Sequence, residues 1–453
     1  MTDPATSFTL SFVGDVMLGR LIDQFFPEHV HDDNDRHSAD HFIEKHPSIL
    51  AHGNYTPSSP WGTTLPFLRA SDLFLINLET SATTTSELWP DKVFNYRMHP
   101  SNLAPILHAA HVDYASLANN HTLDFGNEGL IETAWTLRNA GVAFAGAGES
   151  PDQAFKPAVL YLPRAVQEMH ARRVDGQKNT PTPSKEQTTA AEKQGYLVHV
   201  YSAADHPRDW ASIPAFHLID YSPATRTRLR TLLLSNGSRT RHPPSQESQS
   251  QHTFENKPES DTYHHRAHHH HNTPPDPPER PALKIFSVHW GPNYRWHPGD
   301  RIQSLAHFLI DECEVDIVHG HSSHHVQGVE VYKGGVIIYG CGDFVDDYAL
   351  NREFRNDLGA VWRVVVKEED KAEKNDGKGK GKGKEKDVKG RLVLDRLEIF
   401  PTGVDKFRAM LLDRGAKDHR WVRKKVEELS LELGTKVRKE AGDQGQIIVD
   451  IHG

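Results

Sequence analysis

The sequence predicts an α/β fold whose functional site lies at one edge of an open sheet. Apolar runs typical of buried strands recur along the chain, and several end in glycine beside Asp, Asn, Glu or His. Stretch 316–347 shows this pattern most clearly: 317–318 leads to Gly320, His321 and His324, and 336–339 leads to a second glycine-rich segment. Open α/β sheets bind ligands at the carboxyl ends of their strands, so these polar residues are candidate site residues.

The length and composition predict one main domain with insertions. The chain has 453 residues, 37% of them hydrophobic, which is enough for a large core. Much of the length is compositionally biased. We therefore predict a main domain at 8–345 and a C-terminal extension at 346–453 that completes the fold. Disorder is predicted for the insertions 164–194 and 236–281, and flexibility for the Lys/Gly loop 367–390.

Several classes of protein are disfavoured by the composition. The net charge of -9 argues against nucleic-acid binding, and the 2 cysteines, Cys313 and Cys341, provide neither a disulfide framework nor a thiolate zinc motif. We find no signal peptide and no apolar stretch of the ~20 residues that a membrane span needs. We therefore expect a cytoplasmic protein. Many of the 31 histidines lie in the biased tract that contains HHRAHHHH and need not bind a metal natively.

The N-terminal part supplies two candidate carboxylates. The first strand is predicted at 8–13, and Asp15 follows it; the second is predicted at 73–76, and Glu79 follows it. An aspartate after a first strand is a common metal ligand, although Gly-Asp alone also fits a turn or a helix cap. Residues 27–60 lack periodicity, and we expect a long excursion over the surface.

The remaining elements follow from the same apolar patterns. Further strands are predicted at 114–117, 143–145, 158–162, 196–201, 283–288, 360–366 and 391–400, and helices at 103–110, 129–140, 223–234, 302–310 and 416–433.

Residues 93–126 carry the other candidate site residues. Asn119, Asn120, His121 and Asp124 follow a predicted strand. The oxygen of Asn120 suits a hard metal ion, and His121 is positioned to donate a proton while Asp124 holds its other nitrogen. A helix cap would explain the Asn and the Asp but not the His. Arg97 is a candidate for binding an anionic substrate together with Asn119, although an exposed Arg fits this stretch equally well.

Together these residues form a mixed set of oxygen and nitrogen ligands. The predicted metal ligands are Asp15, Glu79, Asn120, His289, His321 and His324. Such a set suits one or two divalent ions of Mn, Zn, Mg or Fe. A two-metal site would hold a nucleophilic water and neutralise an anionic transition state, with His121 as the general acid.

Six stretches resemble a known family. They are GDVMLGR, NLET, VFNYRMHP, SLANNHTLDFG, HWGPNY and GHSSHHVQGVEVYKGGVIIYGCGDF. In this order they are similar to the CapA family of poly-γ-glutamate capsule synthesis proteins. The resemblance covers about 8–347 and implies a calcineurin-like metallophosphoesterase fold, a four-layered α/β sandwich with its site at one sheet edge. Asn120-His121 is similar to the superfamily's GNH motif, Gly320-His321 to its last motif, and Asp15 to its first aspartate.

The sequence departs from the superfamily pattern at three places and from the pattern of CapA relatives at a fourth. Met17 stands where the first motif has His, and Glu79 is the nearest candidate for the bridging Asp of the second. Two residues separate His321 from His324 where the last motif has one, and Pro292-Asn293 replaces the acidic residue that usually follows HWG. One metal position is therefore expected to be weak or empty.

Two functions remain open from the sequence. One is a metal-dependent hydrolase acting on a phosphoester or a γ-glutamyl, peptide-like substrate. The other is a non-catalytic accessory protein that binds polyglutamate or belongs to a synthase complex. Either function predicts an anionic, small-molecule or polyglutamate-like partner. The low-complexity insertions are typical of eukaryotic proteins, for which capsule synthesis at a cell envelope fits poorly.

Overall fold

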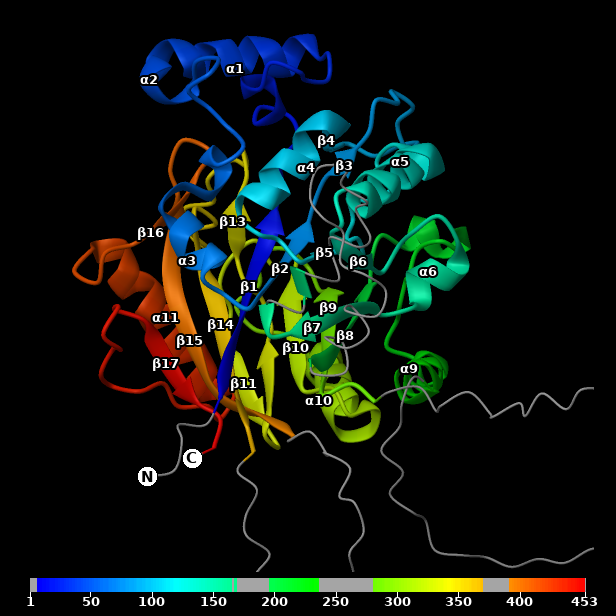
Figure 1. Cartoon of the computed structure of the whole chain (residues 1–453), viewed down its shortest axis with the longest axis vertical. Helices are drawn as coiled ribbons and strands as arrows, with labels where there is room; N and C mark the ends of the chain where they lie inside the picture. Colours follow the sequence, from blue (N-terminus) through cyan, green and yellow to red (C-terminus); the bar gives the residue numbers. More distant parts are fainter. Residues whose placement is uncertain (1–5, 165–166, 169–194, 236–279, 370–390, 453) are drawn as a thin grey trace, which may run out of the picture.

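The computed structural model describes residues 6–164, 167–168, 195–235, 280–369 and 391–452. The insertions predicted to be disordered and the Lys/Gly loop lie almost entirely outside these residues. Each strand and helix predicted above is present, with ends that differ by a few residues. The broad prediction of an α/β fold is confirmed, because helices alternate with the strands of two large sheets (Figure 1).

The first sheet joins the N-terminal strands to the C-terminal ones. Its main order is β16-β15-β14-β1-β2-β5-β6, with β13 beside β1 and β17 beside β15. The strands that follow β1 on one side pair in parallel, whereas β14 to β17 pair antiparallel. The bounds are β1 Ser7–Val16, β2 Leu73–Leu78, β5 Tyr114–Ser116, β6 Ala143–Ala145, β13 Asp343–Val345, β14 Leu358–Glu368, β15 Leu392–Val404, β16 Ala409–Leu411 and β17 Ile447–Asp450.

The second sheet is built from the middle of the chain. Its order is β11-β12-β10-β9-β8-β7, with β8, β9, β10 and β12 parallel and the two edge strands antiparallel. The bounds are β7 Ala158–Leu162, β8 Tyr196–Ala204, β9 Leu283–His289, β10 Ile317–His321, β11 Val329–Tyr332 and β12 Gly335–Ile338. A small third sheet pairs β3, Ser81–Ala82, with β4, Arg97–Met98.

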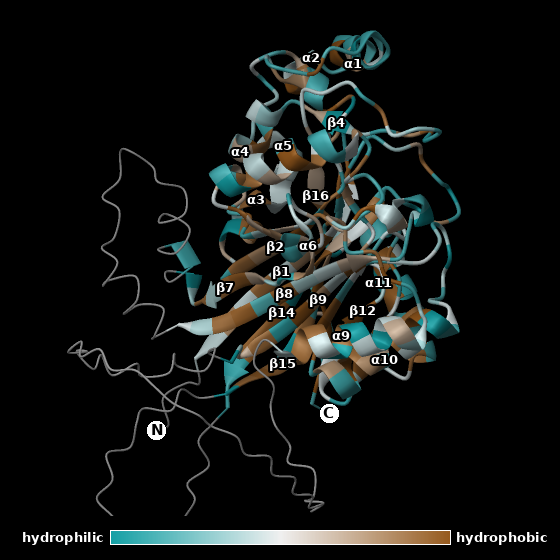
Figure 2. Cartoon of the chain, turned by 90° about the vertical axis from the view of Figure 1, so that its right-hand side faces the viewer, coloured by the Kyte–Doolittle hydropathy of each residue, from teal (hydrophilic) through white to brown (hydrophobic). Residues whose placement is uncertain are grey.

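Alternating side chains bury both faces of the central strands. In β2, Leu73 and Leu75 face the second sheet, whereas Phe74 and Ile76 pack with helices α4, Pro100–Ala109, and α5, Gly126–Asn139. In β9, Leu283 and Ile285 face the first sheet, and Phe286 and Val288 pack with helices α9, Pro223–Ser235, and α10, Asp300–Cys313. The two sheets therefore pack face to face, and apolar strands fill the interior (Figure 2).

Other helices lie around this centre. Helix α11, Lys417–Glu432, packs Val422 and Val426 into the same core as β14 and β15. Shorter helices are α3, Leu65–Arg69, and α6, Pro151–Phe155, and 3-10 turns lie at Asp23–Phe25, Ser59–Thr64 and Arg208–Ser212.

Segment 27–60 is mostly not buried, in keeping with the predicted excursion over the surface, but it contains two helices that its lack of periodicity did not predict. This segment contains helices α1, Asp33–Lys45, and α2, Pro47–Leu50, which lie at the top of Figure 1. In α1 only Ala39 is buried, so the helix has no wide apolar stripe for a pattern search to detect. Its start is instead defined by Asp32, whose side chain accepts hydrogen bonds from the backbone N–H groups of Asn34 and Asp35.

Candidate metal centre

Asp15 lies at the centre of a group of buried polar residues. It is part of β1 rather than beyond its end, because β1 continues to Val16 between β2 and β13. The register places Asp15 beside Asn77 on one side and Asp343 on the other. Nδ2 of Asn77 donates to Oδ1 of Asp15 over 2.8 Å, which fixes the orientation of the carboxylate.

Glu79 is the most unusual carboxylate of this group. It directly follows β2 and is fully buried, and neither of its oxygens has a hydrogen-bond partner among the described residues. Burial, reinforced by the nearby Asp15 and Asp343 carboxylates, raises its pKa well above the usual range. A buried carboxylate without donors is costly, and a bound cation would satisfy it.

The second sheet contributes two paired histidines. Nδ1 of His289, at the end of β9, lies 2.9 Å from Nδ1 of His321, at the end of β10. The same His321 nitrogen lies 4.0 Å from Oδ1 of Asp15, while Nε2 lies 3.1 Å from Oγ of Ser287. Burial lowers the pKa of both histidines well below the usual range, so both rings are neutral, the form that binds metals.

His324 contacts the carboxylates directly. Its Nδ1 lies 2.9 Å from Oδ1 of Asp343 and 3.6 Å from Oδ2 of Asp15. Burial opposes its charged form, but contact with Asp343 and Asp15 raises its pKa to about 9. Burial also raises the pKa of Asp343 to about 7, despite the contact with His324.

These residues form two overlapping groups that could hold metal ions. One consists of Asp15, His289 and His321, and the other of Asp15, Glu79 and His324; in each group the candidate ligand atoms lie within 4.8 Å of one another. Asp15 belongs to both, as a residue that bridges two ions would. Oxygen and imidazole ligands without thiolate suit divalent ions such as Mn, Zn or Fe.

The segment after β5 contains the other predicted residues. The Oδ1 atom of Asn120 is buried and, like the oxygens of Glu79, has no hydrogen-bond partner among the residues that the structure describes. Asn119 is fully buried: its Nδ2 donates to Asn77 Oδ1 and Leu78 O, and its Oδ1 accepts from the N–H of His121. The Asn119 amide thus connects β2 to the backbone of His121.

The His121 ring is fixed through one nitrogen, and its other nitrogen faces the Glu79 carboxylate. Its Nδ1 lies 2.7 Å from Oδ2 of Asp124, and Tyr96 stacks on its ring at 3.7 Å. Its Nε2 lies 3.8 Å from Oε1 of Glu79. Burial lowers the pKa of His121 to about 4, partly offset by Asp124.

Arg97 lies outside this cluster. It contacts the Phe125 ring at 4.8 Å and donates to the carbonyl of Thr85. It lines a cavity of about 470 Å³ together with Arg20. The guanidinium of Arg20 lies 5.6 Å from the centre of the Tyr96 ring, which stacks on His121. A role for Arg97 or Asn119 in substrate binding remains a prediction.

Several residues of the site escaped the sequence argument. Asn77 and Asp343 stand in strands beside Asp15, and the motifs NLE and GCGDF contain them. Lys92 forms an ion pair with Asp124, but nothing in its local sequence marks it. Asp205 and His206 follow β8, where the apolar run was expected to end at 201; the actual strand continues to Ala204 and ends beside them.

A comparison with protein families identifies the chain. Residues 9–348 match the family described as bacterial capsule synthesis protein PGA_cap, and this range contains every predicted site residue. The chain belongs to the PGA_cap family. The resemblance to CapA proteins inferred from the six motifs is thereby confirmed.

Relatives of this PGA_cap chain include proteins of several bacteria. The chain is 30% identical over 442 residues to the "Probable polyglutamine synthesis accessory protein" of Mycobacterium tuberculosis, covering 95% of this chain and 93% of the relative. It is 39% identical over 70 residues to the capsule biosynthesis protein CapA of Bacillus anthracis, covering 16% and 17%. An uncharacterized protein of Sinorhizobium fredii is 25% identical over 311 residues, covering 65% and 62%. Within the described part of the chain, no helix is long and apolar enough to cross a bilayer.

Proposed function

We propose that this PGA_cap protein is a metal-dependent hydrolase with the four-layered fold of the metallophosphoesterases. The substrate would be a phosphoester or a γ-glutamyl, peptide-like compound connected with polyglutamate synthesis. One observation carries the proposal: Asp15 is shared by two buried groups of ligand atoms, and one group includes Glu79, whose oxygens have no partner in the described structure. Burial without donors disfavours the charged form of this carboxylate, and a bound cation would stabilise that form.

The ligand assignment follows from the two groups. Asp15, His289 and His321 would hold one ion, and Asp15, Glu79 and His324 the other, with Asn120 contributing its unpartnered oxygen. When bound, such ions supply Lewis-acid chemistry and an activated water. Ser287, near His321, and Asn77, bonded to Asp15, keep these ligands oriented.

His121 would handle the proton of the leaving group. Asp124 fixes the ring through Nδ1, so Nε2 is the atom that points toward the cluster. The low pKa keeps the ring neutral in the free protein; an anionic substrate beside it would favour the protonated form that acts as a general acid. Asn119 would position His121 through its N–H, and Arg97 would contact an anionic part of the substrate.

Metal analysis tests the proposal. Full-length protein is dialysed against Mn or Zn, and its metal content is measured beside Asp15→Asn and Asp311→Asn variants. Asp311 is a matched control, because it is a surface aspartate paired with Lys333. A further variant, in which Ser replaces His264, His265 and the histidines at 268–271, removes the histidine run. About one to two ions should remain in this variant and in Asp311→Asn and be lost in Asp15→Asn. Protein that takes up no ion with the run removed would refute the proposal.

A non-catalytic accessory function is the second candidate. Met17, fully buried, stands where the superfamily has a metal-binding His, and one relative carries the printed name of an accessory protein. Under this alternative the protein binds polyglutamate or the enzymes of a synthesis complex. The two candidates differ in one measurement: His121→Ala removes turnover if the protein is a hydrolase and leaves polyglutamate binding nearly unchanged if it is an accessory protein.

A further inference from the structure

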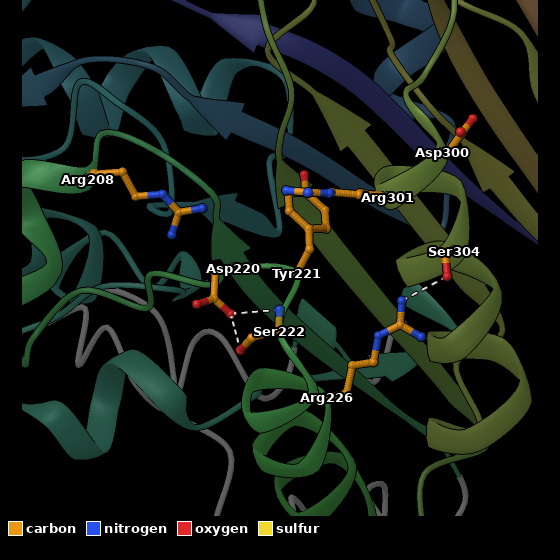
Figure 3. Close-up of a pocket in the computed structure, with 8 residues that line it drawn as sticks. All are labelled: Arg208, Asp220, Tyr221, Ser222, Arg226, Asp300, Arg301 and Ser304. Atoms are coloured by element: carbon orange, nitrogen blue, oxygen red, sulfur yellow. Dashed lines mark hydrogen bonds between the residues drawn. The ribbon is translucent and has the colours of Figure 1, made fainter.

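A cavity of about 650 Å³ lies between the starts of helices α9 and α10. Three arginines line it: Arg208, Arg226 and Arg301 (Figure 3). Ligand pockets of small molecules typically measure about 300–1,000 Å³, so this cavity has room for more than a single small anion.

Much of the hydrogen-bonding capacity of these arginines is unused. Arg208 donates to the carbonyl of Ile219 over 3.0 Å, and Arg226 donates to Oγ of Ser304 over 2.8 Å. Across the described ranges, the side chain of Arg301 forms no hydrogen bond or ion pair. Figure 3 shows Arg208 and Arg301 extending toward Tyr221 from opposite sides. Each guanidinium carries five N–H donors, so the cavity presents many donors to an anion.

The two aspartates of the lining are not in direct contact with these arginines, although the charge of Arg208 contributes to lowering the pKa of Asp220. Asp220 accepts from the N–H and hydroxyl of Ser222 and from Thr225, just before and in the first turn of α9. These bonds lower its pKa to about 2 and commit it to that helix end. Asp300 points away from Arg301 in Figure 3. No ion pair joins either aspartate to the three arginines in the part of the chain that the structure describes.

A short chain of contacts leads from Tyr221, in the cavity lining, to a candidate metal ligand. The hydroxyl of Tyr221 donates to Oδ2 of Asp205 over 2.5 Å, and the N–H of Gly291 donates to the same oxygen over 2.9 Å. Oδ1 of Asp205 lies 2.5 Å from Nδ1 of His206, whose ring centre is 5.1 Å from that of the candidate ligand His289. One short network therefore connects the arginine cavity to the metal ligands.

We propose that Arg208, Arg226 and Arg301 form a subsite for the carboxylates of a multiply charged substrate chain whose reacting bond lies at the metal centre. The subsite rests on the proposed function for its connection to a reaction, but its anion binding is independent of a metal. The planar fork of arginine matches a carboxylate with two parallel hydrogen bonds. Three arginines around one cavity favour a ligand with several carboxylates over a lone phosphate.

Binding to a defined oligomer tests the subsite. Calorimetry on the full chain uses γ-linked pentaglutamate, the same oligomer with every side carboxylate converted to a carboxamide, and inorganic phosphate. Each titration is run with EDTA and again with Mn. The Arg226→Gln/Arg301→Gln variant is compared with Arg414→Gln/Arg420→Gln, which removes two exposed arginines near the start of α11. Circular dichroism verifies folding, and Arg301→Gln alone, at an exposed position, serves if the double variant does not fold.

The expected pattern is specific to the arginine pair. The cavity variant should bind pentaglutamate at least about tenfold more weakly in EDTA, since loss of a charge-assisted hydrogen bond has at least that effect. The control pair should bind pentaglutamate within about twofold of the unmodified protein, and the uncharged oligomer should bind weakly to all proteins.

Equal binding by the cavity variant, equal binding of the uncharged oligomer, or no pentaglutamate binding would overturn the subsite. Phosphate binding as tight as pentaglutamate would overturn the assignment to carboxylates. If the protein takes up no metal but still binds pentaglutamate in EDTA, the proposed hydrolase is refuted and the subsite stands.

Discussion

The two sheets contribute different chemistry to the same site. The first sheet supplies oxygen: Asp15 on β1, Asn77 on β2, Glu79 after β2 and Asp343 on β13. The second sheet supplies imidazole: His289 from β9, His321 from β10 and His324 from the turn that follows β10. Burial raises the pKa values of Glu79 and Asp343, whereas it lowers the pKa values of His289 and His321.

This difference shows what the packing of the two sheets achieves. The first sheet alone presents buried carboxyl groups, and the second alone presents buried imidazoles. Neither makes a mixed ligand set, which appears only where the strand ends of both sheets meet. Four predictions test this division, beginning with the largest expected effect.

Removing one histidine at a time should separate the two ligand groups. His321→Ala deletes a ligand of the group with His289, and His324→Ala deletes a ligand of the group with Glu79. If two ions bind, each variant should retain about one, and turnover should fall to background because both ions act together. Elemental analysis measures the loss, with His111→Asn, an exposed position, as the control. Full metal content in both variants would contradict the assignment.

His121 should affect catalysis without affecting metal content. His121→Asn keeps a nitrogen near Asp124 and removes the Nε2 atom that faces Glu79. We expect kcat to fall about 10²- to 10⁴-fold, the usual contribution of general acid–base catalysis, while the metal content is unchanged. The control is again His111→Asn, because asparagine tolerates the left-handed backbone of that residue (φ 57°). Unchanged kcat would remove His121 from the mechanism.

Ser287 should tune metal affinity from the second sheet. Its hydroxyl lies 3.1 Å from Nε2 of His321 and 3.1 Å from Nδ1 of His319, and so holds the ligand ring in place. Ser287→Ala should weaken metal binding about 10- to 100-fold, as losses of such supporting contacts do. Competition with a fluorescent chelator measures the affinity. Ser304→Ala in α10, outside both ligand groups, should leave it unchanged.

Acid should destabilise the protein through a buried neutral histidine near the second sheet. Burial lowers the pKa of His217, from 6.5 to about 4, although its Nδ1 lies 2.7 Å from the carbonyl of Ser202. The unfolded chain therefore takes up this proton first as the pH falls. The stabilisation is present above pH 6.5 and is lost between about pH 6.5 and 4, by about 2 kcal/mol at pH 5.

The matched variant for this effect is His217→Asn, which keeps a donor for the Ser202 carbonyl and does not titrate. Urea unfolding at pH 7 and pH 5 should give a smaller loss of stability in the variant than in the wild type. An equal loss in both proteins would show that His217 does not contribute to the pH dependence.

Predictions from the sequence succeeded where the signal was local. Apolar runs identified the central strands, and the polar residues after them named Asp15, Glu79, His289, His321 and His324, which the structure places within two compact groups. Local patterns failed for α1, whose helix has almost no buried side, and for Lys92, which reaches Asp124 from a long loop. They also missed Asp205 and His206, since the apolar run of β8 gave no sign that the strand continues to them.

The sequence by itself determined which polar residues stand at the strand ends, because strand ends and the residue types that follow them are encoded within a few positions. It also determined the family, because six ordered motifs span most of the chain. Only the tertiary structure decided how these residues combine. That Asp15 is common to both ligand groups, that Glu79 is left without a donor, and that three arginines surround one cavity all depend on contacts between segments far apart in the chain. Such contacts arise from the packing of two sheets and their helices, which no local pattern specifies.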